Sequence, residues 1–106
     1  MSTLYDVLAA AGRDLPDVVV ATDPTGSTTW AVERKVFATL SADGSTASFL
    51  LDPIVAAAAA RTPDVSRSAR GVGWVELRPR VVDGHVADRA AAWLLSGHRR
   101  LTGPGA

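Results

Sequence analysis

The sequence predicts a single α+β domain, a two-layer sandwich in which helices cover one face of a twisted antiparallel sheet of about five strands. Three observations favour this fold. Apolar residues recur at helical spacing near both ends of the chain, short β-branched runs lie between them, and Gly, Pro and Asp separate the runs at short intervals. The predicted order of elements is α-β-β-β-β-α-β-α, with mostly hairpin connections.

The first helix is predicted over residues 3–11. Its apolar side chains follow the spacing i, i+3, i+4 and i+7 and are Leu4, Val7, Leu8 and Ala11. Ser2 or Thr3 can cap the helix, because a side-chain oxygen accepts a hydrogen bond from a free amide at the helix start. Gly12 ends it.

Four strands are predicted over residues 18–20, 28–33, 35–40 and 46–51, where β-branched or alternating apolar residues indicate extended backbone. Glu33-Arg34 forms a tight connection between the second and third strands. Asp43-Gly44 predicts a type I′ hairpin turn, since that turn needs positive φ. The third and fourth strands are therefore antiparallel neighbours.

The second half begins with a helix from Pro53 through Ala60, capped by Asp52. Residues 62–73 are predicted to form a polar, Arg-rich loop, and residues 74–82 the last strand. Asp83 caps a final helix whose core-facing side chains are Val86, Ala90, Trp93, Leu94 and Gly97. One domain is thus predicted over residues 1–98, followed by a flexible C-terminal tail over residues 99–106.

Composition limits the class of protein. The chain has 106 residues, 47% of them apolar, and no Cys. A core of this size needs no disulfide or metal to hold it, and the lack of thiols fits a reducing compartment. We see no secretory signal and no apolar run of ~20 residues. We therefore expect a cytoplasmic protein without a membrane span.

Charge is distributed unevenly along the chain. The formal net charge is zero, but residues 1–60 carry a net charge of −4 and residues 61–106 a net charge of +4. Such asymmetry permits a basic surface for an anionic partner. Folding can equally bring the two halves together and neutralise it.

We expect no enzyme, no metal site and no bound cofactor. His85 and His98 have no carboxylate at ligand spacing and are predicted to be solvated surface residues. Residues 71–76 begin like a dinucleotide-binding fingerprint, but Glu76 occupies its last glycine position and a strand follows in place of a helix. No phosphate-binding loop or nucleophile motif occurs.

The last predicted strand suggests a binding surface. Its core-facing side chains are Val75, Leu77 and Val81, and its opposite face carries Trp74, Glu76, Arg78 and Arg80. If helices cover only one face, the second set lies on the open face, where an indole can stack a base and guanidinium groups can hold phosphate. Further candidate binding residues are Arg67 and Arg70, and Arg34 and Lys35 at a hairpin tip.

Other interpretations of these residues remain open. The 62–73 loop can cover Trp74, and Arg78 can pair with Glu76. Trp30 and Trp93 are predicted to pack in the core, with an open-face position as the alternative for Trp30. Pro79 has no N–H for a ladder, so the last strand is expected to end or to lie at an edge there.

An ordered set of short segments resembles the pattern of the MmcQ/YjbR-like family over nearly the whole chain. These segments are Leu15-Pro16-Asp17-Val18, Trp30-Ala31-Val32, Lys35-Val36-Phe37-Ala38, Asp43-Gly44 and Gly73-Trp74-Val75. The resemblance implies a small bacterial protein with a frataxin-like (CyaY-like) fold and a DNA-binding role. Arg34 departs from the pattern, which usually has Gly in that turn. Iron binding of the frataxin type is not expected, because the acidic residues of this chain are spread through turns.

We therefore predict a non-catalytic DNA-binding protein that binds through a basic and aromatic sheet face. The alternative is a protein-interaction or small-ligand-binding module on the same open face, with an exposed apolar patch around Trp74 and a homodimer as one form of partner.

Overall fold

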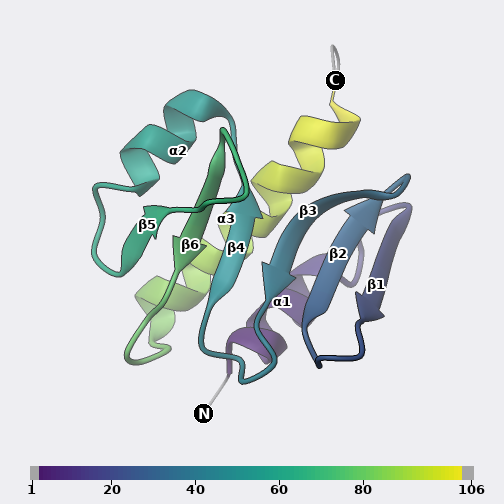
Figure 1. Ribbon diagram of the computed structural model, residues 1–106, viewed down its shortest axis with the longest axis horizontal. Coiled ribbons are helices and arrows are strands. Elements are labelled where there is room, and N and C mark those ends of the chain that lie inside the picture. The colour runs from purple at the N-terminus through teal and green to yellow at the C-terminus, as the bar shows by residue number, and fades with distance from the viewer. Residues whose placement is uncertain (1–2, 104–106) are drawn as a thin grey trace.

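The computed structural model describes residues 3–103 and has a six-stranded antiparallel sheet with three helices. The helices are α1 (Leu4–Gly12), α2 (Pro53–Ala59) and α3 (Gly84–Thr102). The strands are β1 (Val18–Thr22), β2 (Thr28–Val32), β3 (Lys35–Leu40), β4 (Ala47–Leu50), β5 (Val65–Arg67) and β6 (Trp74–Leu77), in the spatial order β1-β2-β3-β4-β6-β5. In Figure 1, α1 and α3 lie behind the sheet and α2 flanks its β5/β6 end. The predicted α+β two-layer architecture is confirmed, with one strand more than expected.

The additional strand arises inside the region predicted to be a loop. β5 pairs with β6, with Val65 opposite Leu77. It has only three residues, two of them polar, so it lacks the apolar alternation that identifies a strand in a sequence. Pairing with β6 supplies the backbone hydrogen bonds that its composition does not predict.

Two predicted boundaries in the second half were wrong. β6 ends at Leu77, because the chain leaves the sheet before Pro79, and Val81 is 64% exposed where a core position was expected. The final helix continues to Thr102, past the predicted domain end at residue 98. Residues 104–106 of the predicted tail lie outside the described part of the chain.

The helix starts follow their capping residues. Thr3 forms a reciprocal capping box with Asp6, and Ser2, the other candidate cap, lies outside the described residues. Asp52 accepts from the amide of Ile54, and Asp83 from the amide of Val86. Within residues 3–103 no helix combines the length and apolar content needed to cross a bilayer.

The type I′ turn is found in the β2–β3 hairpin and not in the β3–β4 hairpin, where it was predicted. Glu33 and Arg34 have φ of 50° and 70°, so the type I′ geometry lies at the β2–β3 turn without a glycine. In the β3–β4 hairpin only Gly44 has positive φ, and the amide of Gly44 donates to the carbonyl of Ser41. The type I′ turn predicted at Asp43-Gly44 was therefore wrong.

The core lies between the sheet and α1 and α3. Trp30, Phe37 and Phe49 are 0–1% exposed, and Trp93 of α3 packs edge-on against Phe49 at 5.9 Å between ring centroids. His98, predicted to be solvated, is buried; its Nε2 lies 3.0 Å from the carbonyl oxygen of Pro16, and its ring lies edge-on to Phe37. It extends the buried face of α3 because the helix runs on past Gly97.

Candidate functional site

Trp74 lies on the open face of the sheet, the face that carries neither α1 nor α3 (Figure 1). Val75 and Leu77 of β6 are fully buried in the core, and side chains alternate along a strand, so Trp74 and Glu76 project to the opposite side. Both are half-buried, and Trp74 lies opposite Leu50 in the β4–β6 ladder. The predicted open-face position of this indole is therefore observed.

The guanidinium of Arg70 lies over the Trp74 indole, with its Cζ 5.2 Å from the ring centroid. Arg70 comes from the β5–β6 loop, which turns back sharply: Gly71 and Gly73 have φ of 144° and 85°. The amide of Trp74 donates to the carbonyl of Gly71, and the amide of Ser68 donates to the carbonyl of Trp74. These glycines therefore shape the loop that places Arg70 on the indole.

A row of hydroxyl side chains crosses the open face beside this stack. The sheet register aligns Thr29, Thr39, Ser48 and Ser66 with Glu76, and we refer to the four hydroxyl residues as the hydroxyl row. Part of the hydroxyl row lines a shallow cavity of about 270 Å³. Arg70, Glu76 and Asp23 line the same cavity. Thr39 and Ser48 are buried, so the accessible hydrogen-bonding side chains here are Thr29, Ser66 and Glu76, and they lie on the same face as the aromatic ring and its cation.

Arg78 follows β6 on the same side. Its Nε donates to the hydroxyl of Thr46 at 3.2 Å, and its guanidinium lies 3.9 Å from the Glu76 carboxylate. The Arg78 side chain is 72% exposed, so this ion pair is weak and leaves the cation accessible. We call Arg70, Trp74, Glu76, Arg78 and the hydroxyl row the Trp74 face.

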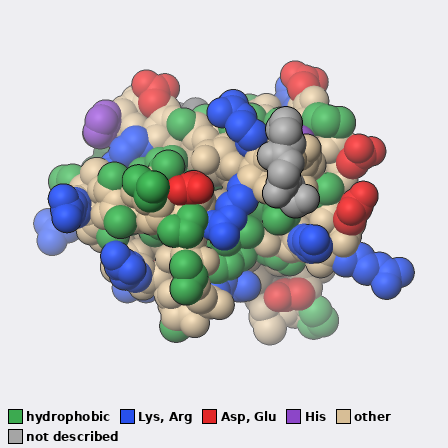
Figure 2. Space-filling view, turned by 90° about the horizontal axis from the view of Figure 1, so that it is seen from above, with side chains coloured by type: hydrophobic (Ala, Val, Ile, Leu, Met, Phe, Trp, Pro, Cys, Tyr) green, Lys and Arg blue, Asp and Glu red, His purple; other side chains and the backbone are tan. Residues whose placement is uncertain are grey.

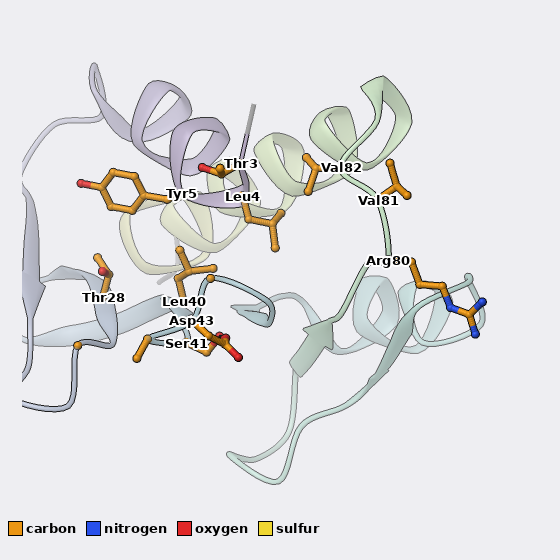
Figure 3. Close-up of a pocket in the computed structure, with 13 residues that line it drawn as sticks. Thr3, Leu4, Tyr5, Thr28, Leu40, Ser41, Asp43, Arg80, Val81 and Val82 are labelled. Carbon is orange, nitrogen blue, oxygen red and sulfur yellow. The ribbon is translucent and has the colours of Figure 1, made fainter. Parts of the chain in front are cut away.

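The other predicted binding residues lie elsewhere. Arg67 is opposite Val75 in the β5–β6 ladder, so its side chain projects to the helix-bearing side of the sheet. Arg80 lies in the connection from β6 to α3, and its guanidinium points away from the neighbouring cavity (Figure 3). Arg34 and Lys35 lie at the β2–β3 turn, separated from β6 by β3 and β4. Of the predicted residues, the structure thus places Arg70 against Trp74 and puts Arg78 further along the same face, beside Glu76.

Positive charge does not gather into one large patch at the end of the molecule seen in Figure 2. There the Lys and Arg side chains are spread among apolar and acidic groups. On the Trp74 face itself, Arg70 and Arg78 are accompanied by Glu76, and Asp23 lies beside it. The local charge is therefore close to balanced, and the face has few cations for contacts with a polyanion.

A larger cavity of about 640 Å³ lies at the other end of the molecule, at the start of α1. Leu4 of α1 and Leu40 of β3 point toward one another across it, and the ring of Tyr5 lies along one wall (Figure 3). Val81 and Val82 from the β6–α3 connection complete the apolar lining. Sequence reasoning missed this cavity because segments far apart in the chain form it, and Val81 was predicted to face the core from a strand.

Two carboxylates of the loops are held in their charged form. The Ser41 hydroxyl, together with the amide and hydroxyl of Ser45, lowers the pKa of Asp43 to about 2. The Thr25 hydroxyl is the main cause that lowers the pKa of Asp23 below its usual value. Both groups organise their own turns, which accounts for their hydrogen bonds without a bound ligand.

In the part of the chain that the structure describes, no group of three or more His, Asp or Glu side chains is placed to hold a metal ion. His85 is exposed, and the buried His98 is occupied by Pro16.

No family model, no curated protein and no solved structure matches this chain. The resemblance to the MmcQ/YjbR-like family therefore stays a prediction from the sequence.

Proposed function

We propose that this protein is a non-catalytic nucleic-acid-binding module and that the Trp74 face binds single-stranded DNA. The observation that carries the proposal is the stack of the Arg70 guanidinium on the Trp74 indole, 5.2 Å from the ring centroid, on the side of the sheet without α1 and α3. Indole and guanidinium planes are the groups on which unpaired bases stack. Arg78 adds an exposed cation close by.

The shape of the face favours single strands over duplex DNA. A base can reach the Trp74 ring only if it is unstacked, and α1 and α3, the two longer helices, lie behind the sheet where they cannot enter a groove from this side. Thr29 and Ser66, the accessible members of the hydroxyl row, offer hydrogen bonds to sugar oxygens and base edges. Two arginines support about two phosphate contacts, so log K is expected to fall with log salt at a slope of about −1.4.

The test is fluorescence anisotropy with a labelled oligothymidylate of twelve nucleotides, titrated with protein at several salt concentrations. Trp74→Leu keeps an apolar side chain beside Leu50 and removes the ring, and it is expected to weaken binding about tenfold or more. Arg70→Gln is expected to weaken binding and to make the salt slope shallower. Arg61→Ala, an exposed arginine at the end of α2, is the matched control and should change affinity less than twofold.

Equal losses in Arg61→Ala and Arg70→Gln would mean that binding is diffuse and does not use the Trp74 face. Equal affinity for a duplex of the same length would contradict the single-strand assignment. Absence of saturable binding at 100 µM protein and low salt would reject the function.

A second candidate function rests on the 640 Å³ cavity, whose volume lies within the range of small-molecule sites. Its lining is mainly apolar, and its polar and charged members are Thr3, Thr28, Ser41, Asp43 and Arg80. We infer that it would hold a compact apolar molecule with one hydrogen-bonding end. Anilinonaphthalene sulfonate is a suitable fluorescent probe. Ala42→Phe places a ring at an exposed lining position and should abolish the fluorescence gain, whereas Ala92→Phe on exposed α3 should not.

A further inference from the structure

The strand β1 is an edge of the sheet with one side free. It pairs with β2 over Val18–Thr22, and within residues 3–103 no strand lies beyond it in the sheet order (Figure 1). Edge strands present alternate N–H and C=O groups outward, which is a template for another extended chain. Val19 and Val20 are 63% and 52% exposed, so apolar side chains on both faces of this strand lack cover.

The opposite edge of the same sheet is protected. β5 has three residues, Ser66 and Arg67 are polar, and α2 contacts it. Short length, charge and a covering helix are the usual means by which proteins prevent unwanted strand pairing. β1 has five residues and contains no charge, proline or glycine. Of the two edge strands, β1 therefore lacks the features that prevent pairing with another strand, and β5 has them.

Carboxylates stand at both ends of β1. Asp17 precedes the strand and Asp23 follows it, and both are exposed. The basic residues Arg34 and Lys35 belong to the β2–β3 turn, one strand further from any chain that adds to the outer edge of β1. The first 60 residues, which include β1 together with α1, β2, β3, β4 and α2, also carry a net charge of −4.

These charges discriminate between two occupants. If a second copy paired antiparallel through the centre of β1, Val20 would face its own equivalent, and Asp17 would lie opposite the partner's Asp23 at both ends. Like charges directly opposite one another are destabilising. An extended peptide with a cationic residue at each end would attract the carboxylates of Asp17 and Asp23, whereas in a self-paired dimer these carboxylates would repel each other.

We propose that the outer edge of β1 binds an extended peptide by antiparallel strand addition, and that the preferred peptide has β-branched residues at its centre and Lys or Arg at both ends. Backbone hydrogen bonds would give the affinity, Val19 and Val20 would contact alternate peptide side chains, and Asp17 and Asp23 would select the ends. This site is separate from the Trp74 face and does not depend on the DNA-binding proposal.

The experiment uses a fluorescein-labelled peptide Lys-Val-Thr-Val-Thr-Val-Lys and the full chain, with anisotropy measured at 50 mM salt. Replacing both peptide lysines with glutamate is expected to weaken binding about tenfold. On the protein, Asp17→Asn with Asp23→Asn should weaken binding of the lysine peptide about fivefold. Asn tolerates the positive φ of Asp17 and can accept the turn hydrogen bonds of Asp23, so the fold is expected to persist.

Two N-methylated peptides test strand addition itself. Methyl groups on the first, third and fifth residues block one edge of the extended peptide, and methyl groups on the second, fourth and sixth block the other. Strand addition predicts that one set abolishes binding and the other leaves it within threefold. Loss with both sets, loss with neither, or no saturation at 500 µM protein would overturn the proposal.

Sedimentation equilibrium addresses the alternative occupant. The native protein is expected to be monomeric at 50 µM. A dimer that Val19→Lys dissociates would show that a second copy occupies the β1 edge, and it would overturn the peptide assignment.

Discussion

The two faces of the sheet are built from the same strands and have opposite character. On the helix-bearing face, Phe49 and Val75 are fully buried neighbours in the β4–β6 ladder. One residue away on the same two strands, Ser48 faces Glu76 on the open face, beside the Arg70–Trp74 stack. A shift of one residue therefore separates a side chain that packs against the helices from one on the open side of the sheet, where Ser48 is itself buried among its neighbours and Glu76 is half-buried.

We therefore expect the residues of the two faces to serve different purposes, stability on one face and binding on the other. The apolar face packs against α1 and α3, whereas on the open face Arg70 of the folded-back β5–β6 loop lies over Trp74. Stability should therefore depend on alternate residues of β2, β3, β4 and β6, and binding on the residues between them. Substitutions on the two faces provide a direct test of this division.

The largest expected effect is that of Phe49→Ala. It removes a fully buried ring that packs against Trp93, and the cavity left behind should lower the free energy of unfolding by about 3–5 kcal/mol. Ser48→Ala, its neighbour on the other face, should change that free energy by about 0.5 kcal/mol or less. Urea denaturation followed by circular dichroism measures both. If both variants lost a comparable free energy of unfolding, the proposed division of stability between the two faces would be wrong.

Gly97→Ala should lower the free energy of unfolding by about 1–3 kcal/mol, because α3 packs against the backbone of the sheet there. An added Cβ would lie 3.0 Å from the Leu50 carbonyl oxygen and 3.1 Å from that of Phe37, and backbone cannot move aside easily. Gly84→Ala at the start of the same helix is the control, since a Cβ there has no neighbour within 4 Å. That variant is expected to be neutral or slightly stabilising in thermal unfolding.

Local signals predicted much of the fold. Thr3, Asp52 and Asp83 cap the helices as expected, and the alternation in residues 28–40 gives β2 and β3, because caps and alternation depend on neighbours in sequence. β5 was not predictable in this way, since its pairing with β6 is a tertiary effect acting on a polar three-residue segment. The burial of His98 likewise follows from the length of α3 and its position over Phe37.

The candidate site was predictable only in part. Strand alternation placed Trp74 and Arg78 on one face, but the strand was wrongly extended to residue 82, so that it included Arg80. The contact of Arg70 with the indole depends on the φ values of Gly71 and Gly73, which alternation does not encode. Arg67 belongs to an unpredicted strand, and its orientation follows from that pairing.

Arg34→Gly is expected to raise the free energy of unfolding by about 1 kcal/mol. Arg34 has φ of 70°, a conformation that costs a residue with a Cβ but not glycine. The turn belongs to neither face, so the gain should appear without a change in DNA or peptide binding. Lys35→Gly, in the extended first position of β3, is the control and should be destabilising. A loss of stability in Arg34→Gly would show that the arginine side chain itself supports the turn.

The smallest expected effect concerns the pKa of Asp43 in the loop between β3 and β4, which lines the larger cavity. The pKa of Asp43 is about 2 in the folded protein, below its ordinary value of 3.8, because the Ser41 hydroxyl and the Ser45 amide and hydroxyl donate to its carboxylate. A folded-state pKa that is depressed contributes stability above the unfolded value, and this contribution is lost as the pH falls from about 4 toward 2.

Carboxyl-carbon NMR titration of the native protein should therefore give an Asp43 midpoint near 2. Ser41→Ala removes the main hydroxyl donor and should move the midpoint toward its usual value, with a smaller move in Ser45→Ala, which keeps the amide donor. Both variants should leave the core unchanged at neutral pH. A native midpoint near the usual value would mean that these hydrogen bonds do not persist in solution, and the hairpin would then depend on Gly44 alone for its turn.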